Sequence, residues 1–267
     1  MAKGGGKAAA LLICAAALAA SGATAATRQA AVDFSGMWIV QQGYTAAKLK
    51  PAPMLTPEVQ AQRQRRQLAN ANGYYRSLSN MLCQGGGGPA LSLMNSPFEI
   101  VQGFGRVTFI FETETFNQPR TVYLMEKTQP DNIFPSNNGH SIGHWEGKTL
   151  VVDTVAFSGR SSLPGGIPAS DQAHIVERLS LSKDGKVLTD VMTMTDPKSL
   201  AQPWTTTVKY DRDPSDEELI QVSCEPDLDA IKSLDLPALK DADPEVARLL
   251  NAAHPPDPAL KVATKPN

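Results

Sequence analysis

Hydrophobic and polar residues alternate in short runs along the middle of the chain. From Pro97 to Glu225, segments rich in β-branched and aromatic residues are separated by turn residues, and no helical periodicity intervenes. The runs are FEIVQGF, RVTFIFETE, RTVYLMEK, HSIGHW, KTLVVDTVAF, HIVERLSLS, KVLTDVMTMT, PWTTTVKY and LIQVSC. With an earlier run, DFSGMWIV at 33–40, they predict about ten strands, mostly joined by hairpin-length links. Such spacing predicts an all-β fold, an up-and-down antiparallel meander closed as a barrel or curled into a deep sheet.

Two segments outside this pattern favour helices. In residues 55–73, Thr56 can cap a helix and Pro57 suits its first position, and the many Gln and Arg residues that follow indicate a surface helix. The same logic predicts a short C-terminal helix at residues 243–250. The chain beyond it, 255–267, is rich in proline and is expected to be disordered.

Three segments carry the composition of loops. Residues 85–88 are four consecutive glycines followed by proline, which breaks any regular structure. Residues 132–139 and 159–171 are rich in Pro, Gly and Ser and are longer than the other connections. Long loops on a barrel often surround its mouth, so these two are candidates for that position.

The N-terminus has the order of a secretory signal. Lys3 and Lys7 precede an apolar run at 8–20, and small residues follow as far as Ala25. The run is too short to span a bilayer, which needs roughly 20 apolar residues. We therefore expect a signal peptide at 1–25, a barrel domain at 26–225 and an extension at 226–267, in a periplasmic or secreted protein. A lipoprotein signal ending at Cys14 is the alternative.

Charge and cysteine content narrow the possible partners. Removing the signal takes away two of the 25 basic residues and none of the 27 acidic ones, which leaves 23 against 27 and a formal charge of −4. This balance does not favour nucleic acid as a partner. Cys83 and Cys224 are the remaining cysteines, and an isolated pair in an oxidising compartment predicts a disulfide. Two buried thiols are the alternative.

A turn signal at 184–185 fixes the face of two acidic residues. Asp-Gly is a strong two-residue hairpin signal, and it pairs Leu179 with Asp190 and Glu177 with Met192. Glu177 and Asp190 then share an otherwise apolar face. Buried carboxyl groups have raised pKa values unless they are paired, so both are candidate general acids or ligand contacts. The alternatives are that the face is not fully buried or that another strand supplies an Arg or Tyr.

A second turn, at 146–147, suggests an imidazole and carboxylate pair. A two-residue loop there places His140 opposite Asp153, close enough for a hydrogen bond. An imidazole oriented by a carboxylate is typical of acid–base catalysis. A purely structural bond is the alternative, and a three-residue loop would remove the pairing. His144 shares the face of His140 but lies about 13 Å away along a strand, so no metal site is predicted.

Two segments carry resemblances to known families. DFSGMW resembles the Gly-x-Trp first strand of lipocalin-like barrels, which implies a structural role for Trp38. Residues 139–157, GHSIGHWEGKTLVVDTVAF, are similar to the G-x-S-x-G-x-W-E-G-D-T-L-V-V-D-T block of a family of secreted bacterial proteins. Lys148 replaces the family's Asp, and residues 122–130 keep Tyr123 and Pro130 but lack the acid, the Arg and the His that the family carries there. The resemblance therefore implies a barrel and export rather than a mechanism.

These observations support three hypotheses of function. The first is a carrier of a small apolar or aromatic molecule held inside the barrel. Its candidate ligand-binding residues are Tyr123, Phe109, Phe111, Met192, Met194 and His144. The second is a lyase, hydratase or isomerase that needs no cofactor; its candidate catalytic residues are His140, Asp153, Glu177 and Asp190. The third is an interaction module of the cell envelope. Neither a metal nor a membrane span is expected, and the sequence does not set the oligomeric state.

Overall fold

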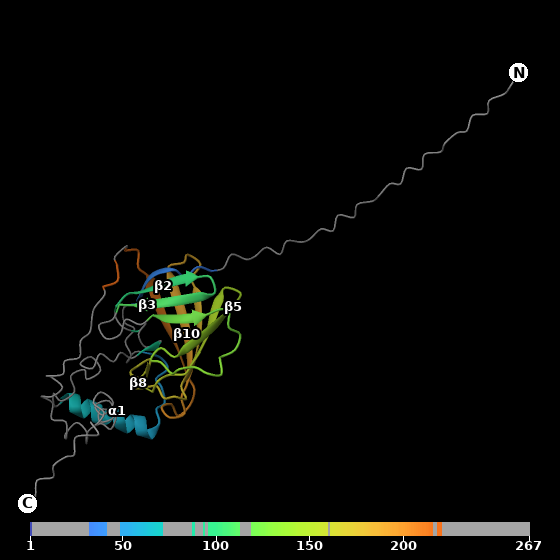
Figure 1. Ribbon diagram of the computed structural model, residues 1–267. Coiled ribbons are helices and arrows are strands. Elements are labelled where there is room, and N and C mark those ends of the chain that lie inside the picture. The colour runs from blue at the N-terminus through green and yellow to red at the C-terminus, as the bar shows by residue number, and fades with distance from the viewer. Residues whose placement is uncertain are drawn as a thin grey trace, which may run out of the picture. The chain divides into compact units, whose positions relative to one another are not determined.

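The computed structural model describes most of the central part of the chain. The described residues are Met1, 32–41, 49–71, 87–88, 93, 96–112, 119–159, 161–215 and 218–220. All of them except Met1 belong to one compact unit, 32–267. The fold is mostly β, with one described helix lying beside the strands (Figure 1). The signal peptide, both cysteines of the expected disulfide and the C-terminal helix fall outside the described residues.

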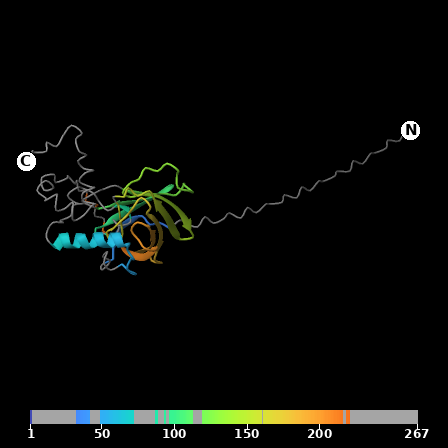
Figure 2. The same ribbon diagram turned by 90° about the horizontal axis from the view of Figure 1, so that it is seen from below.

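Nine strands form a closed barrel. They are β1 (Gly36–Val40), β2 (Phe98–Gly103), β3 (Arg106–Phe111), β4 (Arg120–Tyr123), β5 (His140–Glu146), β6 (Thr149–Val155), β9 (His174–Leu181), β10 (Val187–Thr195) and β11 (Trp204–Arg212). The order around the barrel follows the chain, and β11 pairs with β1 to close it. Figure 2 shows the curved sheet from below. Closure leaves no exposed sheet edge along these strands.

The expected all-antiparallel meander is wrong at one pair of neighbours. Strands β4 and β5 run parallel, with Val122 opposite Ser141 and Tyr123 opposite Ile142. A parallel pair needs a connection that returns along the sheet, and residues 124–139 supply it. This explains why that connection is longer than a hairpin turn. It also covers part of the outer face of the barrel, where Gln129 bonds to Asp153 and His140.

The hairpin of β9 and β10 has the register expected from the sequence. Leu179 lies opposite Asp190, and Glu177 lies opposite Met192. The turn has Gly185 at a φ of 72°, where a side chain would be strained. The Asp184 carboxylate accepts hydrogen bonds from the Ser182 hydroxyl at 2.6 Å and from the backbone N–H of residue 186 at 3.2 Å. The Asp-Gly signal therefore set the register correctly.

The hairpin of β5 and β6 differs from the expected one by two residues. Glu146 pairs with Thr149, so the two-residue loop is Gly147 and Lys148 rather than Glu146 and Gly147. Gly147 has a φ of 61°, and a turn with glycine at its first central position is the type II′ hairpin turn. His140 consequently lies opposite Val155, and the expected pairing of His140 with Asp153 is wrong. A shift of two residues leaves every side chain on its expected face.

Helix α1 (Pro57–Ala71) begins at the cap that the sequence indicated. The Thr56 hydroxyl accepts a hydrogen bond from the backbone N–H of Val59 at 3.4 Å and donates one to the carbonyl of Lys198 at 3.0 Å. Leu55 forms a bridge with Leu200, and Val59 is buried. The start of the helix is therefore fixed to the turn between β10 and β11. No helix among the described residues has the length and apolar character needed to span a bilayer.

The loop expected at 159–171 contains a small hairpin of two strands, β7 (Ser162–Leu163) and β8 (Ile167–Pro168). Its Leu163 and Ile167 are fully buried in the core. The run expected at 219–224 has no strand in its two described residues, and the rest of it lies outside the described part of the chain. Strand β11, by contrast, is longer than the run that predicted it.

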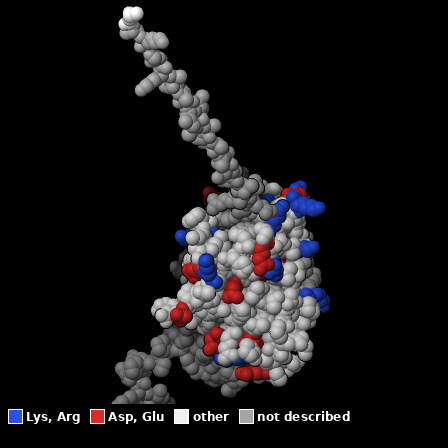
Figure 3. All heavy atoms as spheres, turned by 90° about the vertical axis from the view of Figure 1, so that its right-hand side faces the viewer, with Lys and Arg blue, Asp and Glu red and all other residues white. Residues whose placement is uncertain are grey.

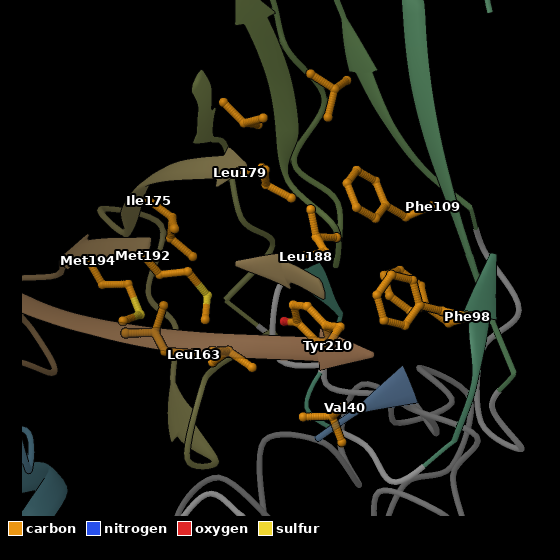
Figure 4. Close-up of a cluster of buried hydrophobic side chains, with 14 of the residues drawn as sticks. Val40, Phe98, Phe109, Leu163, Ile175, Leu179, Leu188, Met192, Met194 and Tyr210 are labelled. Carbon is orange, nitrogen blue, oxygen red and sulfur yellow. The ribbon is translucent and has the colours of Figure 1, made fainter. Parts of the chain in front are cut away.

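Apolar side chains from several strands pack together inside the barrel (Figure 4). Phe98 contacts Tyr210 edge to face, with ring centroids 5.1 Å apart. Trp38 is fully buried, and its indole N–H donates to the Phe34 carbonyl at 2.9 Å. The Arg212 guanidinium lies 4.3 Å from the centroid of the Trp38 ring. Trp38 thus has the structural position that its likeness to lipocalin-like barrels implied.

Candidate functional site

The four candidate catalytic residues divide between the two faces of the barrel wall. Glu177 and Asp190 are each 2% exposed and point inward. His140 and Asp153 lie on the outer face, with side chains 19% and 38% exposed. Successive side chains along a strand point to opposite faces. Val152 of β6 and Glu177 of β9 pair with each other and point inward, whereas the next residue, Asp153, pairs with an outward residue of β9. The four groups therefore do not face a common space.

Arg120 is the partner of Glu177 inside the barrel. Its Nη1 donates to Oε1 of Glu177 at 2.9 Å, and its Nη2 donates to Oε2 of the same carboxylate. Arg120 is 3% exposed, and among the described residues it is the only buried lysine or arginine. Burial alone would lower the pKa of Arg120, but the charge and hydrogen bonds of Glu177 outweigh it and the pKa is raised. The pair is a buried, two-point ion pair.

Two hydroxyl groups also accept hydrogen bonds from this guanidinium. Arg120 donates from Nη2 to the Thr154 hydroxyl at 3.0 Å and from Nε to the Ser141 hydroxyl at 3.3 Å. The two hydroxyls lie 2.9 Å apart and bond to each other. Ser141, Thr154 and Glu177 come from β5, β6 and β9, which are neighbours in the sheet. The ion pair is thus held at a fixed place against one side of the interior.

Asp190 is the second carboxyl group of the cluster. Burial raises its pKa well above the ordinary value, the negative charge of Glu177 raises it further, and Arg120 only partly offsets these effects. A hydrogen bond with Glu177 acts in the same direction, so the surroundings favour the neutral form of Asp190. Its Oδ1 is enclosed by the protein, and no described residue supplies a hydrogen-bond donor to it.

Apolar side chains surround these polar groups. The Arg120 guanidinium lies 5.5 Å from the centroid of the Phe109 ring. Leu179 and Val208 are the cross-strand neighbours of Asp190, and both are buried. Figure 4 shows Leu179, Leu188, Phe98 and Phe109 directed toward the same interior region from different strands. The arrangement is one small polar cluster in an apolar lining, the usual character of a small-molecule site.

The candidate ligand-binding residues are also divided between the faces. Phe109, Phe111, Met192 and Met194 are buried in the interior. The expectation that Tyr123 and His144 line the interior is wrong. Tyr123 is 37% exposed and follows the inward Val122, and His144 is 66% exposed and follows the inward Gly143. Both residues occupy outward positions of their strands, and a single step along a strand changes the face.

A second polar cluster lies on the outer face, over strands β5, β6 and β9. Oδ2 of Asp153 lies 2.8 Å from Nε2 of His174, and its Oδ1 accepts a hydrogen bond from the Gln129 amide at 2.8 Å. The other end of that amide, Oε1, lies 2.9 Å from Nδ1 of His140. Because the Gln129 nitrogen donates to Asp153, its oxygen is the acceptor and Nδ1 of His140 carries a hydrogen. Gln129 therefore connects the two residues that the sequence had paired directly.

The ionisable groups of the outer cluster influence one another. The hydrogen bond from His174 lowers the pKa of Asp153, and the bond to Asp153 raises the pKa of His174. His140 stacks on Tyr123 with ring centroids 5.2 Å apart, and its Nε2 lies 3.6 Å from Oε2 of Glu126. Gln129 and Glu126 both belong to the long connection before β5. That connection therefore covers the outer cluster.

Metal ligands and surface charge give no stronger candidate in the described part of the chain. No group of three or more His, Cys, Asp or Glu side chains among the described residues has a geometry that could hold a metal ion. On the face shown in Figure 3, acidic and basic side chains of the described residues are interspersed. The interior cluster and the outer cluster are therefore the candidate sites in the described part of the chain.

Comparisons with known proteins find likenesses among solved structures. No protein-family model matches the chain, and no curated protein matches it either. Among solved structures, wild-type UnaG, a fluorescent protein, has a TM-score of 0.34 at 14% identity, over 67% of this chain and 97% of its own. A single-residue mutant of UnaG gives 0.33 at 15% identity, over 68% and 97%. A secretory abundant heat soluble protein from Ramazzottius varieornatus gives 0.33 at 11% identity, over 67% and 94%.

Sequence reasoning missed Arg120 and Gln129. Arg120 begins a short run that pairs with β3 after a long connection and with β5 in parallel, so no tight hairpin turn indicates its register. The run itself carried one signal: in RTVY, Arg120 alternates with Val122, an apolar residue, and so shares its face. Gln129 lies in an irregular connection, where no periodicity applies. The closed barrel agrees with the lipocalin-like architecture that the Gly-x-Trp strand implied.

Proposed function

We propose that the protein binds a small, mostly apolar molecule inside its barrel, with one polar group of that molecule against the cluster of Arg120, Glu177 and Asp190. The observation that carries the proposal is the closed barrel, whose apolar interior holds one buried polar cluster. Small-molecule sites combine a mostly apolar surrounding with a few placed polar groups.

The lining supports an apolar or aromatic body for this molecule. Phe98, Phe109 and Phe111 stack at one side of the interior, with ring centroids 5.6 to 6.4 Å apart. Met192 and Met194 lie on another side, and methionine side chains adapt readily to the shape of a ligand. A ligand that fits this interior would bury most of its surface against carbon and sulfur atoms.

We further propose that the protein acts after export, in the periplasm or outside the cell. The support is the N-terminal sequence, where Lys3 and Lys7 precede the apolar run at 8–20 and Ala25 suits cleavage. The expected disulfide between Cys83 and Cys224 fits the same compartment. A carrier in such a compartment would hold a poorly soluble molecule away from water.

Acid–base catalysis is a second candidate function, and the outer cluster favours it. His174 and His140 flank Asp153, directly in one case and through Gln129 in the other. An imidazole with a raised pKa beside a carboxylate can exchange protons near neutral pH. We rank this candidate below ligand binding because the His174 and Asp153 side chains are 41% and 38% exposed, which gives little shelter from water to a reacting molecule.

The proposed function is tested by identifying any small molecule that co-purifies with the protein. The full chain is expressed with its own N-terminus, purified from the exported fraction and examined by native mass spectrometry. We expect an added mass of a few hundred daltons that disappears on unfolding and can be identified in the extract. The same protein, stripped with a hydrophobic resin, is titrated with N-phenyl-1-naphthylamine, a neutral apolar probe whose emission rises in apolar surroundings.

Matched variants show where the molecule binds. Asp190→Leu removes the buried acceptor at nearly constant volume and should change the affinity for the co-purified molecule. Asp211→Leu makes the same substitution at an exposed position on β11 and should leave that affinity unchanged. A protein with neither a co-purified molecule nor saturable probe binding would contradict the proposal. Equal effects of the two substitutions would place the bound molecule elsewhere.

A further inference from the structure

Two large apolar side chains lie exposed, side by side, at one end of the barrel. Gly103 pairs with Arg106, so the turn between β2 and β3 consists of Phe104 and Gly105 alone. Phe104 is 93% exposed and Met125 is 70% exposed. Met125 lies against Gly105, the neighbour of Phe104, because its Cγ is 2.9 Å from the place where a side chain would start there. We call Phe104 and Met125 the apolar tip.

The two segments that carry the apolar tip are joined to each other and to the barrel. The backbone N–H of Leu124 donates to the Gly105 carbonyl at 2.8 Å. Leu124 packs against the core, and Tyr123 stacks on His140 with ring centroids 5.2 Å apart. The exposed side chains of the tip are therefore presented from a fixed backbone.

Three basic residues lie at the same end of the barrel. Arg106 directly follows the turn that carries Phe104, and Lys127 is two residues beyond Met125. Strand β4 runs toward the tip and β5 runs parallel to it, so the turn after β5, which contains Lys148, lies at this end as well. All three basic residues are exposed, and within the described part of the chain none of them forms an ion pair. Their charges are thus available to a partner.

The acidic residues closest to them in sequence are turned toward other groups. Oε2 of Glu126 is buried and lies 3.6 Å from Nε2 of His140. Oε2 of Glu146 accepts from the Arg178 guanidinium at 2.6 Å. The part of this end around the tip therefore presents more positive than negative charge, although the whole chain has a formal charge of −2. The side of the same end formed by β9, β10 and β11 carries both signs, with Lys183, Asp184, Lys186 and Asp211.

We propose that this end of the barrel docks on the surface of an anionic lipid bilayer. Phe104 and Met125 enter the boundary between headgroups and acyl chains, where burial of apolar side chains is favourable. Arg106, Lys127 and Lys148 lie at the level of the lipid phosphates, whose negative charge attracts them. The docking does not depend on the ligand proposed for the interior.

A bilayer fits the apolar tip better than a protein partner does. A stable protein interface buries about 800 Å² on each partner. An aromatic side chain presents only about 150–250 Å², so Phe104 and Met125 together fall well short of that area. Side chains that project from the surface also enter a fluid bilayer without needing a complementary shape. Tyr123, which is 37% exposed beside Met125, suits the headgroup layer, where tyrosine is enriched in membrane proteins.

Co-sedimentation with lipid vesicles tests the docking. The full chain, purified after export, is mixed with sucrose-loaded vesicles of phosphatidylcholine alone or of phosphatidylcholine and phosphatidylglycerol in equal parts. We expect the protein to sediment with the anionic vesicles and more weakly with the neutral ones. Binding to the anionic vesicles should fall as the salt concentration rises, because salt screens the attraction between exposed charges.

Two phenylalanines of equal exposure give a matched comparison. Phe134 is 94% exposed, and it lies two residues from Ser136, which bonds to the carbonyl of Ala156 beyond the opposite end of β5 and β6. We expect Phe104→Ser to lower the partition coefficient for anionic vesicles about tenfold, as loss of a buried phenylalanine side chain should. Phe134→Ser should leave the partition coefficient unchanged.

Charge variants separate attraction by the headgroups from apolar insertion. Arg106→Gln and Lys127→Gln should each lower binding to anionic vesicles about fivefold and leave binding to neutral vesicles nearly unchanged. Lys209→Gln removes an equal charge from an exposed position on β11 and should have a much smaller effect.

A tryptophan at the tip reports insertion directly. The emission of Phe104→Trp should shift to shorter wavelength when anionic vesicles are added, whereas Trp38 and Trp204 are already buried and contribute little to the change. Phe134→Trp should show no such shift.

Several results would overturn the docking. One is the absence of sedimentation with anionic vesicles, and another is equal binding to both kinds of vesicle at every salt concentration. Equal losses in Phe104→Ser and Phe134→Ser would show that the tip is not the contact. Self-association that Phe104→Ser abolishes, without vesicle binding, would assign the tip to a second copy of the chain. The interior is measured separately, by binding of N-phenyl-1-naphthylamine to the same variants without vesicles, and that binding should not change.

Discussion

Replacing Asp190 with asparagine isolates the effect of a buried proton on the stability of the fold. The amide has the shape of a protonated carboxyl group, and it can donate to Glu177 as the protonated acid does. The substitution therefore removes the titration and keeps the hydrogen bonds. Glu177 retains its ion pair with Arg120 in the variant, so the buried charge stays compensated.

The magnitude follows from counting protons in the two states. In the unfolded chain an aspartate titrates near pH 3.9, whereas burial and the charge of Glu177 raise the pKa of Asp190 in the folded protein. Between these two pKa values, the buried pair of carboxyl groups holds one proton that the unfolded chain has lost. The free energy of unfolding then falls by about 1.4 kcal/mol for each unit of rising pH. The asparagine variant lacks this slope.

Urea unfolding followed by tryptophan fluorescence measures the difference, because Trp38 and Trp204 are buried in the core. Curves are recorded for the protein, for Asp190→Asn and for the exposed control Asp211→Asn, at several values from about pH 5 to about pH 8 and constant ionic strength. We expect the stability of Asp190→Asn relative to the protein to rise steadily with pH, and that of Asp211→Asn to stay level. A difference that does not change with pH would refute the assignment of a protonated Asp190.

Three further predictions concern the two clusters and the barrel closure. Glu177→Gln leaves the Arg120 charge uncompensated and should lower the free energy of unfolding by about 3–5 kcal/mol, whereas Glu177→Leu combined with Arg120→Met should lie close to the original protein in the same urea assay. Proton NMR should give His174 a pKa above its ordinary value, and Asp153→Asn should lower that pKa. The stabilisation of the fold by this pair is complete below about pH 6.5 and is lost as the pH rises through the His174 pKa. It amounts to under about 1 kcal/mol, because both side chains are partly exposed. Arg212→Met removes bonds to two backbone carbonyls and the contact with an indole ring, and should cost about 1–3 kcal/mol, with a change in tryptophan emission in the folded protein.

Strong local signals predicted the parts of the fold that local energetics control. The Asp-Gly turn at 184–185 gave the register of β9 and β10, because few residues adopt the backbone angles of that turn. The same register correctly placed Glu177 and Asp190 on the inward face. Thr56 marked the start of α1, since a hydroxyl in that position satisfies a backbone N–H.

Long-range pairing controls the parts that the sequence did not predict. The weak turn at 146–147 could be read in two ways that differ by two residues, and both keep the same faces, so hydrophobic alternation could not separate them. The parallel pairing of β4 with β5 depends on a connection of irregular structure. Arg120 reaches Glu177 across that pairing, so their contact follows only from the closed sheet.

The interior cluster shows what an alternating pattern alone leaves open. Glu177 and Asp190 on an apolar face were candidate general acids unless another strand supplied an Arg or Tyr, and Arg120 of β4 is such a partner. In the barrel, the Glu177 carboxylate pairs with Arg120. Burial and the negative charge of Glu177 then raise the pKa of Asp190. A site built in this way pairs one buried cation with one buried carboxylate and holds a second carboxyl group with a raised pKa beside them. The sequence pattern did not reveal Arg120. This residue nevertheless sets the electrostatic surroundings of Glu177 and Asp190, which the pattern placed on the inward face.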